Sequence, residues 1–206
     1  MIAIIDYGAG NLFSLCSSLE SLGLAAKVTR SAADLAQASH LILPGVGAFG
    51  DAMQKLTATG LVPVIAAQVQ AGKPLLGICL GMQMLFDTSC EYGTHAGLKL
   101  IAGDICALED DLRSAGYAYK VPHMGWNNLQ IKQPQNKLLR HTKQGEYVYF
   151  VHSFYAKNCD ESIVASSEYG VSVPAVVAKD NVYGCQFHPE KSGRTGLAIL
   201  SAFAQI

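Results

Sequence analysis

Short, largely apolar runs alternate with amphipathic segments through the first half of the chain, and this alternation limits the fold more than any other feature. Continuous runs of this kind are typical of strands in a parallel sheet that helices cover on both faces. The pattern therefore predicts a β-α-β-α arrangement. Four strands are predicted in it: Ile2–Ile5, Ala26–Thr29, His40–Leu43 and Pro74–Ile78.

The segments between these strands show helical periodicity. Leucines recur on one stripe from Leu12 to Leu22, and Ser31 stands three residues before Asp34 in a capping-box pattern. Further helices are predicted from Asp51 onward, over Leu61–Ala71, and from the fourth strand through Phe86.

After about Gly97, strand signals separated by turns replace the alternation. A helix near Gly193–Ala204 closes the chain, and the stretch Asp110–Trp126 is the most irregular. Since no linker or repeat divides the chain, we expect one domain over residues 1–206. The predicted class is α/β: an open, mixed, mostly parallel sheet with helices on both faces and a β-rich C-terminal half. The late strands are predicted at Ile101–Leu108, Asn128–Ile131, Glu146–Val151, Ile163–Ser167, Val173–Lys179 and Val182–Gln186.

Composition excludes several classes of protein. Hydrophobic residues make up 50% of the chain and charged residues 15%, which excludes wholesale disorder. Fifteen basic and sixteen acidic residues leave a net charge of -1 without charge runs, which argues against nucleic-acid and membrane-surface partners. The N-terminus lacks the basic region of a signal peptide, so we expect a cytoplasmic protein. Six cysteines without a C-x-x-C pair are too few for a disulfide scaffold, and reduced thiols are expected.

A cysteine stands where the fourth predicted strand must turn directly into a helix. The segment Gly77-Ile78-Cys79-Leu80-Gly81 is the nucleophile-elbow pattern G-x-S-x-G with Cys in place of Ser. Such a turn is strained, and its glycines let strand and helix approach closely. A helix N-terminus also favours a thiolate and a developing oxyanion. The alternative is that Cys79 is a small buried apolar residue, as most free cysteines are.

A histidine and a glutamate near the C-terminus supply a base and a carboxylate to orient it. His188 precedes Pro189, which favours extended backbone, and side chains two residues apart on an extended chain point the same way. Glu190 can therefore reach the imidazole. Alone, these residues are more typical of a strand terminus. Together with Cys79 they form a triad of nucleophile, base and orienting group.

A glycine-rich loop, Pro44–Gly50, follows the third strand and matches G-x-G-x-x-G. A dinucleotide site also needs an acidic residue about 20 positions further on, but none occurs between Asp51 and Asp87. We interpret the loop as a source of backbone N–H groups for an oxyanion hole shared with the Leu80 N–H. A simple tight turn is compatible with that role.

The histidines show no spacing typical of metal ligands, so neither a metal nor another cofactor is expected. His152, beside Tyr149 and Ser153, either lines the cleft or is an ordinary strand-end residue. Spacing alone does not decide between packing and ligand contact for Trp126, the only tryptophan.

These segments together resemble a known family. Gly77–Gly81 followed by Met82-Gln83, with His188-Pro189-Glu190 near the C-terminus, resembles the triad-type (class I) glutamine amidotransferases. The resemblance covers the whole chain and implies a flavodoxin-like core. Four further segments resemble one branch of that family, the glutaminase subunits of imidazole glycerol phosphate synthase: Asp6–Leu12, Pro44–Asp51, Pro122–Asn127 and Phe187–Gly193.

The resemblance implies a chemistry. Cys79 would attack the side-chain amide of glutamine, forming a glutamyl thioester and releasing ammonia, and His188 would protonate the departing amine and activate water. The Val46 peptide would turn before its N–H faces the oxyanion. The resemblance also implies roles by motif position. The oxyanion would be served by the backbone of Gly45, Val46 and Gly47 and by the Leu80 N–H, and the glutamine pocket would be bounded by Gln83, Glu91, His152 and Ser153. The partner interface and the ammonia route would lie near Tyr149, Lys191 and Trp126.

A glutaminase fold that occupies all 206 residues leaves no room for a domain that consumes ammonia. A separate polypeptide is therefore expected. By resemblance it is the (β/α)8-barrel cyclase subunit, which in a heterodimer makes imidazole glycerol phosphate and aminoimidazole carboxamide ribotide for histidine biosynthesis. Weak activity alone and stimulation by the loaded partner are expected.

Two residues within Ser89–Leu100 depart from the family pattern. Cys90 replaces a commonly acidic or small residue, and Lys99 replaces a glycine, so that turn must accommodate a side chain. Three alternative functions stay open at this point: a glutaminase subunit for anthranilate, pyridoxal phosphate or purine synthesis, a non-catalytic binding subunit, and a general cysteine hydrolase or protease.

Overall fold

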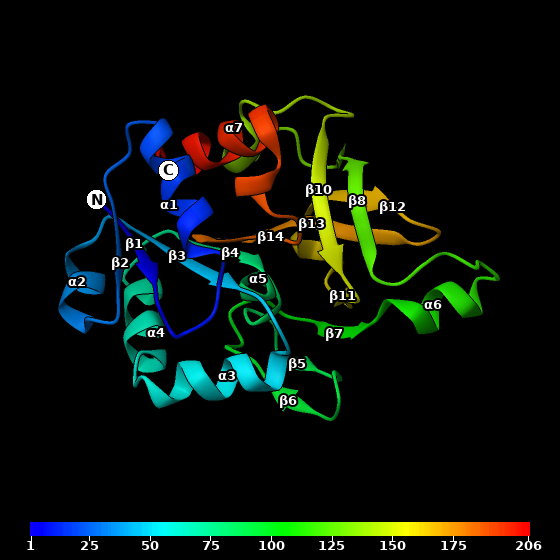
Figure 1. Ribbon diagram of the computed structural model, residues 1–206, viewed down its shortest axis with the longest axis horizontal. Coiled ribbons are helices and arrows are strands. Elements are labelled where there is room, and N and C mark those ends of the chain that lie inside the picture. Colours follow the sequence, from blue (N-terminus) through cyan, green and yellow to red (C-terminus); the bar gives the residue numbers. More distant parts are fainter.

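A computed structural model describes residues 1–206, and an eight-stranded sheet lies at the centre of the molecule (Figure 1). The strand order is β2-β1-β3-β4-β14-β13-β12-β9. The first five of these strands are parallel, and the last three continue the sheet in antiparallel fashion. The predicted open, mixed sheet is confirmed. Its strands are β1 (Ile2–Ile5), β2 (Ala26–Thr29), β3 (His40–Gly45), β4 (Leu75–Cys79), β9 (Gln130–Ile131), β12 (Ile163–Glu168), β13 (Ser172–Lys179) and β14 (Val182–Cys185).

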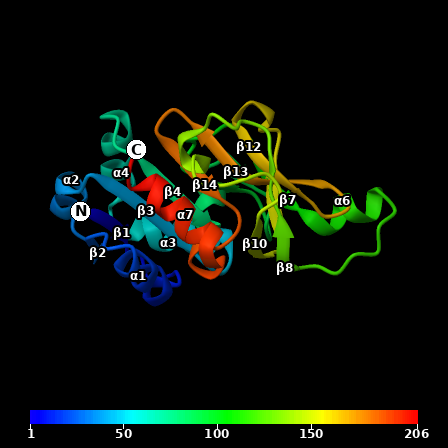
Figure 2. The same cartoon turned by 90° about the horizontal axis from the view of Figure 1, so that it is seen from above.

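Two hydrophobic cores lie on the two faces of this sheet. Successive side chains of a strand point to opposite faces, so Ala3 and Ile5 of β1 lie in one core, whereas Ile2 and Ile4 lie in the other. Helices cover both faces, as predicted (Figures 1 and 2). One face carries α1 (Leu12–Ser21) and α7 (Gly193–Phe203), and the other carries α2 (Ala32–Gln37), α3 (Phe49–Ala58) and α4 (Val62–Gln70). None of the helices combines the length and apolar character that crossing a membrane requires.

Two smaller sheets contain the remaining strands (Figure 1), whereas β9, β12, β13 and β14 of the β-rich second half extend the main sheet. One is an antiparallel pair of β8 (His123–Asn128) and β10 (Tyr147–His152). The other has the order β11-β7-β5-β6. Its strands are β5 (Thr88–Ser89), β6 (His95–Ala96), β7 (Asp104–Ala107) and β11 (Phe154–Lys157).

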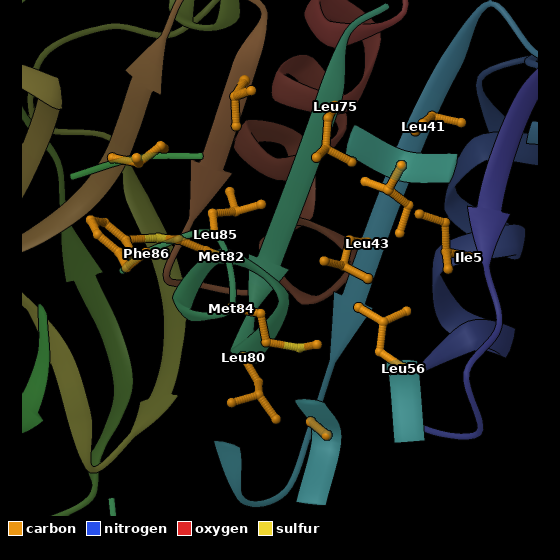
Figure 3. Close-up of a cluster of buried hydrophobic side chains, with 14 of the residues drawn as sticks. Ile5, Leu41, Leu43, Leu56, Leu75, Leu80, Met82, Met84, Leu85 and Phe86 are labelled. Atoms are coloured by element: carbon orange, nitrogen blue, oxygen red, sulfur yellow. The ribbon is translucent and has the colours of Figure 1, made fainter. Parts of the chain in front are cut away.

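The predicted helix through Phe86 is wrong, because α5 covers only Leu80–Gln83. Carbonyl oxygens of residues 84–86 accept hydrogen bonds from N–H groups of residues 98–101, at 2.8 to 3.2 Å. These carbonyls therefore do not continue a helix. Figure 3 shows the apolar side chains of this segment within the core cluster that also contains residues of β1, β3 and β4; they are Leu80, Met82, Met84, Leu85 and Phe86.

The stretch predicted to be irregular, Asp110–Trp126, contains most of α6 (Leu108–Ser114) and the beginning of β8. Leu108 and Leu112 are buried one helical turn apart, and three acidic residues lie in the first turn, where they favour a helix N-terminus. The strand predicted over Ile101–Leu108 is shortened to β7, and β11 was not predicted.

Candidate functional site

Cys79 is the last residue of β4 and lies directly before α5. Its backbone has φ 53° and ψ -112°, a region that costs a non-glycine residue about 1–3 kcal/mol. The turn is tight because Gly81 crosses β3: a Cβ atom there would overlap the carbonyl oxygen of Leu43. The strand-to-helix turn predicted from the glycine spacing is therefore present, with Cys79 in the strained position.

A cavity of about 320 Å³ opens beside this turn. Its size suits a small molecule. Most of the residues expected to surround a substrate line it, together with three that were not predicted, Pro122, Val151 and Phe154. The lining residues are Val46, Gly47, Cys79, Leu80, Gln83, Glu91, Pro122, Val151, His152, Ser153, Phe154 and His188.

His188 follows β14 and lies at the edge of the cavity, where its side chain is 4% exposed. Its Nδ1 lies 2.8 Å from Oε1 of Glu190, the carboxylate two residues further on. Burial lowers the pKa of His188, but the neighbouring Cys79 sulfur and Glu190 carboxylate outweigh burial and raise it to about 9. The imidazole is thus held as a cation at neutral pH.

The Cys79 thiol makes two long contacts. It donates to the Val151 carbonyl at 3.9 Å, and it accepts from Nε2 of Gln186 at 3.9 Å. The same sulfur also lies close enough to His188 to raise the pKa of the imidazole. Gln186 is fully buried and was not predicted, since no pattern marks it.

The glycine-rich loop passes the mouth of the cavity. Gly45 packs against the backbone of Leu80 and Gly81 and does not line the cavity, whereas Val46 and Gly47 do. The N–H groups of Val46 and Gly47 have no hydrogen-bond acceptor within the chain. Tyr7, from the loop after β1, anchors Pro44 at the beginning of the glycine-rich loop, because its hydroxyl donates a hydrogen bond to the Pro44 carbonyl at 2.9 Å.

Two polar residues of the cavity wall already hold other parts of the fold. Gln83 donates through Nε2 to the Phe154 carbonyl at 2.9 Å and to Oε1 of Gln186 at 3.1 Å. Glu91 accepts the N–H of Phe49 with Oε2 at 2.6 Å and so caps α3. Glu91 also lines the cavity, and its other carboxylate oxygen, Oε1, forms no hydrogen bond.

His152 ends β10, and Ser153 follows it at the cavity. Both ring nitrogens of His152 are already engaged. Nδ1 lies 2.9 Å from the Phe154 carbonyl, and Nε2 lies 3.0 Å from Nδ1 of His123. His123, at the start of β8, is a second buried histidine that was not singled out from the sequence.

Two of the three residues expected near a partner, Tyr149 and Trp126, contact each other next to His188. The Tyr149 carbonyl accepts the His188 N–H at 3.0 Å, and its ring packs edge-on against Trp126, with centroids 6.1 Å apart. Trp126 is 55% exposed and approaches Gly193. Lys191 is exposed and forms no ion pair. Trp126 and Lys191 are thus exposed, whereas Tyr149 is half-buried between Trp126 and the backbone of His188.

The two departures from the family pattern are accommodated locally. Lys99 adopts a φ of 57°, so the turn takes a side chain in a left-handed conformation that a glycine would adopt more easily. Cys90 is exposed and follows β5, next to Cys106 at the end of the neighbouring β7. All six cysteines are unpaired, and no cluster of three or more His, Cys, Asp or Glu side chains could hold a metal ion.

Comparisons with known proteins give a consistent result. The family Glutamine amidotransferase class-I matches residues 3–205. The "Imidazole glycerol phosphate synthase subunit HisH" of Geobacillus kaustophilus (strain HTA426) is 52% identical over 207 residues, covering 100% of this chain and 97% of the relative. The protein of the same name from Caldanaerobacter subterraneus subsp. tengcongensis is 48% identical, covering 100% and 98%.

Solved structures share the fold at lower identity. "Crystal structure of glutamine amidotransferase" matches with a TM-score of 0.75 and 18% identity, over 99% of this chain and 100% of that chain. "Structure of PurLQS from Thermotoga maritima" matches with a TM-score of 0.73 and 18% identity, over 99% and 97%. At this identity the likeness concerns the fold alone.

Proposed function

This chain belongs to the class-I glutamine amidotransferase family, and we propose that it is the subunit that releases ammonia from glutamine in an imidazole glycerol phosphate synthase of histidine biosynthesis. The family predicted from the motifs is confirmed. One observation carries the proposal: Cys79 and His188 both line one small cavity, and Oε1 of Glu190 lies 2.8 Å from Nδ1 of the His188 imidazole.

The first half of the proposed reaction forms a thioester. The Cys79 sulfur attacks the side-chain amide carbon of glutamine as a thiolate, and the C–N bond breaks as a proton passes from the His188 cation to the departing nitrogen. The products are ammonia and a γ-glutamyl thioester on Cys79. A pKa of about 9 suits His188 to this step, because the ring carries the required proton at neutral pH.

In the second half, His188 takes a proton from water, which attacks the thioester carbonyl. The C–S bond breaks, glutamate and one proton are released, and the Cys79 thiolate and the His188 cation are restored. In both halves, the Glu190 carboxylate accepts a hydrogen bond from Nδ1 of His188 and so keeps the imidazole in one orientation. The Leu80 N–H, directly after the nucleophile, is placed to serve the oxyanion in both halves. The free N–H groups of Val46 and Gly47 are candidates for its second donor.

The cavity wall is suited to an amino acid. Glu91 offers a free carboxylate oxygen for the α-ammonium group of glutamine, and Ser153 offers a hydroxyl. Gln83 stabilises the wall through its bonds to Phe154 and Gln186. Such a cavity is too small for an extended peptide, which disfavours a protease.

A partner subunit is part of the proposal for two reasons. Ammonia release without an acceptor wastes glutamine, and the relatives are each named as one subunit of a synthase. We assign to that partner a (β/α)8-barrel cyclase that joins ammonia to a phosphorylated ribulosyl nucleotide. Tyr149, Trp126 and Lys191 would contact it, because Trp126 and Lys191 are exposed and Tyr149 connects Trp126 to the backbone of His188.

The test is glutamate release by the purified chain, alone and with the cyclase barrel and its nucleotide ligand. We expect little release by the chain alone, stimulation in the loaded complex and none with Cys79→Ala. Cys159→Ala is the matched control, because Cys159 is a buried thiol remote from the cavity. Equal rates with and without the loaded partner would contradict the coupling. No release by a verified complex would contradict the activity.

A further inference from the structure

A row of hydrogen bonds runs from the cavity wall into the second half of the chain. The Phe154 carbonyl lies 2.9 Å from Nδ1 of His152, whose Nε2 lies 3.0 Å from Nδ1 of His123. Nε2 of His123 in turn lies 3.3 Å from Nδ2 of Asn127, which also lies 2.9 Å from the Glu168 carbonyl. The row thus begins and ends at a backbone carbonyl.

The direction of every hydrogen bond in the row follows from these end groups. A carbonyl oxygen only accepts, so Nδ1 of His152 carries the proton and its Nε2 accepts. His123 must therefore donate from Nδ1 and accept at Nε2. At the other end, Asn127 is oriented independently, since its Oδ1 accepts the Asn128 N–H at 2.8 Å. Its Nδ2 is then a donor toward His123, and the two ends of the row demand the same arrangement.

The surroundings keep both rings neutral. His123 is 2% exposed and His152 is 5% exposed. Burial lowers the pKa of His123 to about 4. Burial, followed by the neighbouring His123, lowers the pKa of His152 to about 3. Stacking fixes the His123 ring as well, because it lies between the rings of Phe150 and Tyr169, with centroids 4.7 and 4.0 Å away.

We propose that His123 and Asn127 are positioning residues that hold His152 as a neutral ring, protonated at Nδ1, in one orientation at the cavity wall. Because both nitrogens of His152 are engaged, the ring faces the cavity with its carbon atoms and offers a substrate no hydrogen bond. This inference rests on the proposed function, in which the cavity binds glutamine.

A neutral wall has a chemical reason. His188 lines the same cavity and is held as a cation, and a second imidazolium there would repel it. A charged His152 would also attract the new carboxylate of the product glutamate more strongly than the neutral amide of glutamine. The row therefore favours binding of the substrate over retention of the product.

Asn127→Asp is the most direct variant, because it keeps the shape of the side chain but replaces the donor facing His123 with an acceptor. Nε2 of His123 must then carry a proton, which leaves the ring charged or reverses its tautomer. We expect nitrogen-15 NMR of the resting wild-type complex to find His123 and His152 both protonated at Nδ1 alone, the tautomer that free histidine disfavours. In Asn127→Asp we expect His123 to be protonated at Nε2.

A pair of substitutions at His123 separates positioning from a general structural role. The side-chain nitrogen of Asn reaches the place of the imidazole Nδ1, so His123→Asn keeps the donor to His152, whereas His123→Leu removes it. In the partner complex we expect His123→Leu to raise the KM for glutamine by about tenfold, the loss expected for one buried hydrogen bond, with little change in kcat. His123→Asn should restore a KM near that of the wild type.

The outcomes separate this inference from the proposed function. A wild-type His152 protonated at Nε2, or a KM that is the same in His123→Leu and the wild type, would overturn the positioning role. Equal losses in His123→Leu and His123→Asn would also overturn it, because they would indicate a packing defect alone. A wild-type complex that releases no glutamate would overturn the proposed function, and the NMR result on the resting protein would still decide the tautomer.

Discussion

Glu190→Gln changes the charge behind the catalytic imidazole with almost no change in shape. In the wild type, Oε1 accepts from Nδ1 of His188 at 2.8 Å, and Oε2 is buried without a partner. A Gln oxygen can still accept the hydrogen bond but carries no charge. The substitution therefore isolates the electrostatic contribution of the carboxylate.

The size of that contribution follows from the pKa of His188, which burial lowers but the Cys79 sulfur and Glu190 carboxylate raise from 6.5 to about 9. At 1.36 kcal/mol for each pKa unit, this difference is worth about 3 kcal/mol of stability. Since the pKa is higher in the folded protein, the contribution is fully present below pH 6.5 and is lost as the pH rises through about 9. In Glu190→Gln the Cys79 sulfur still opposes burial, so the pKa of His188 should fall below its wild-type value without losing the whole of its rise.

Urea unfolding at pH 6 and at pH 9.5, together with NMR titration of His188, measures both quantities. Because the Cys79 sulfur contributes part of the raised pKa of His188, we expect Glu190→Gln to be less stable by about 1–3 kcal/mol at pH 6, with a much smaller difference at pH 9.5. Glu109→Gln is the matched control: its exposed ion pair with Arg113 contributes at most about 1 kcal/mol. A His188 pKa that is the same in Glu190→Gln and the wild type would refute the reasoning.

Three further variants test the geometry of the fold and the elbow. Gly81→Ala places a Cβ against a backbone carbonyl of β3 and should destabilise the protein in urea unfolding. Gly72 has a positive φ but open space around it, so Gly72→Ala should cost less, about 1 kcal/mol. Equal losses in the two variants would contradict the close approach of Gly81 to β3. Cys79→Gly should be inactive yet about 1 kcal/mol more stable than Cys79→Ala, because glycine relieves the positive φ, and equal thermal stability of the two would argue against strain. Asp111→Asn should lower stability by about 1–3 kcal/mol at pH 7, because it removes the carboxylate that accepts a hydrogen bond from Lys157 at 2.8 Å. The pKa of Asp111 is lowered despite burial, so this loss of stability should fade as the pH falls below about 3.8. A loss that persists at pH 2 would contradict this origin.

The parallel half of the fold could be predicted from the sequence because each strand there is a local pattern. The predicted strands over Ile2–Ile5 and Ala26–Thr29 coincide with β1 and β2, and Pro74–Ile78 differs from β4 by one residue at each end. The turn at Cys79 was predictable as well, since the flanking glycines have a steric cause.

The rest depended on contacts between distant segments. The helix predicted through Phe86 ends early because backbone groups of residues 98–101 take its carbonyls. In the site, two-residue spacing predicted that Glu190 reaches the imidazole, and the structure places these groups 2.8 Å apart. Gln186 and His123 had no local signal, because their roles arise only when β14 and β8 meet the cavity wall.

The central claim is that Cys79 releases ammonia which a partner subunit then consumes. Product formation by the complex of Cys79→Ala with the cyclase, supplied either with glutamine or with an ammonium salt, tests it most directly. We predict no product from glutamine and a wild-type rate with ammonium, because the variant loses only the source of nitrogen. Product from glutamine in this variant, or loss of the ammonium-dependent reaction as well, would contradict the account.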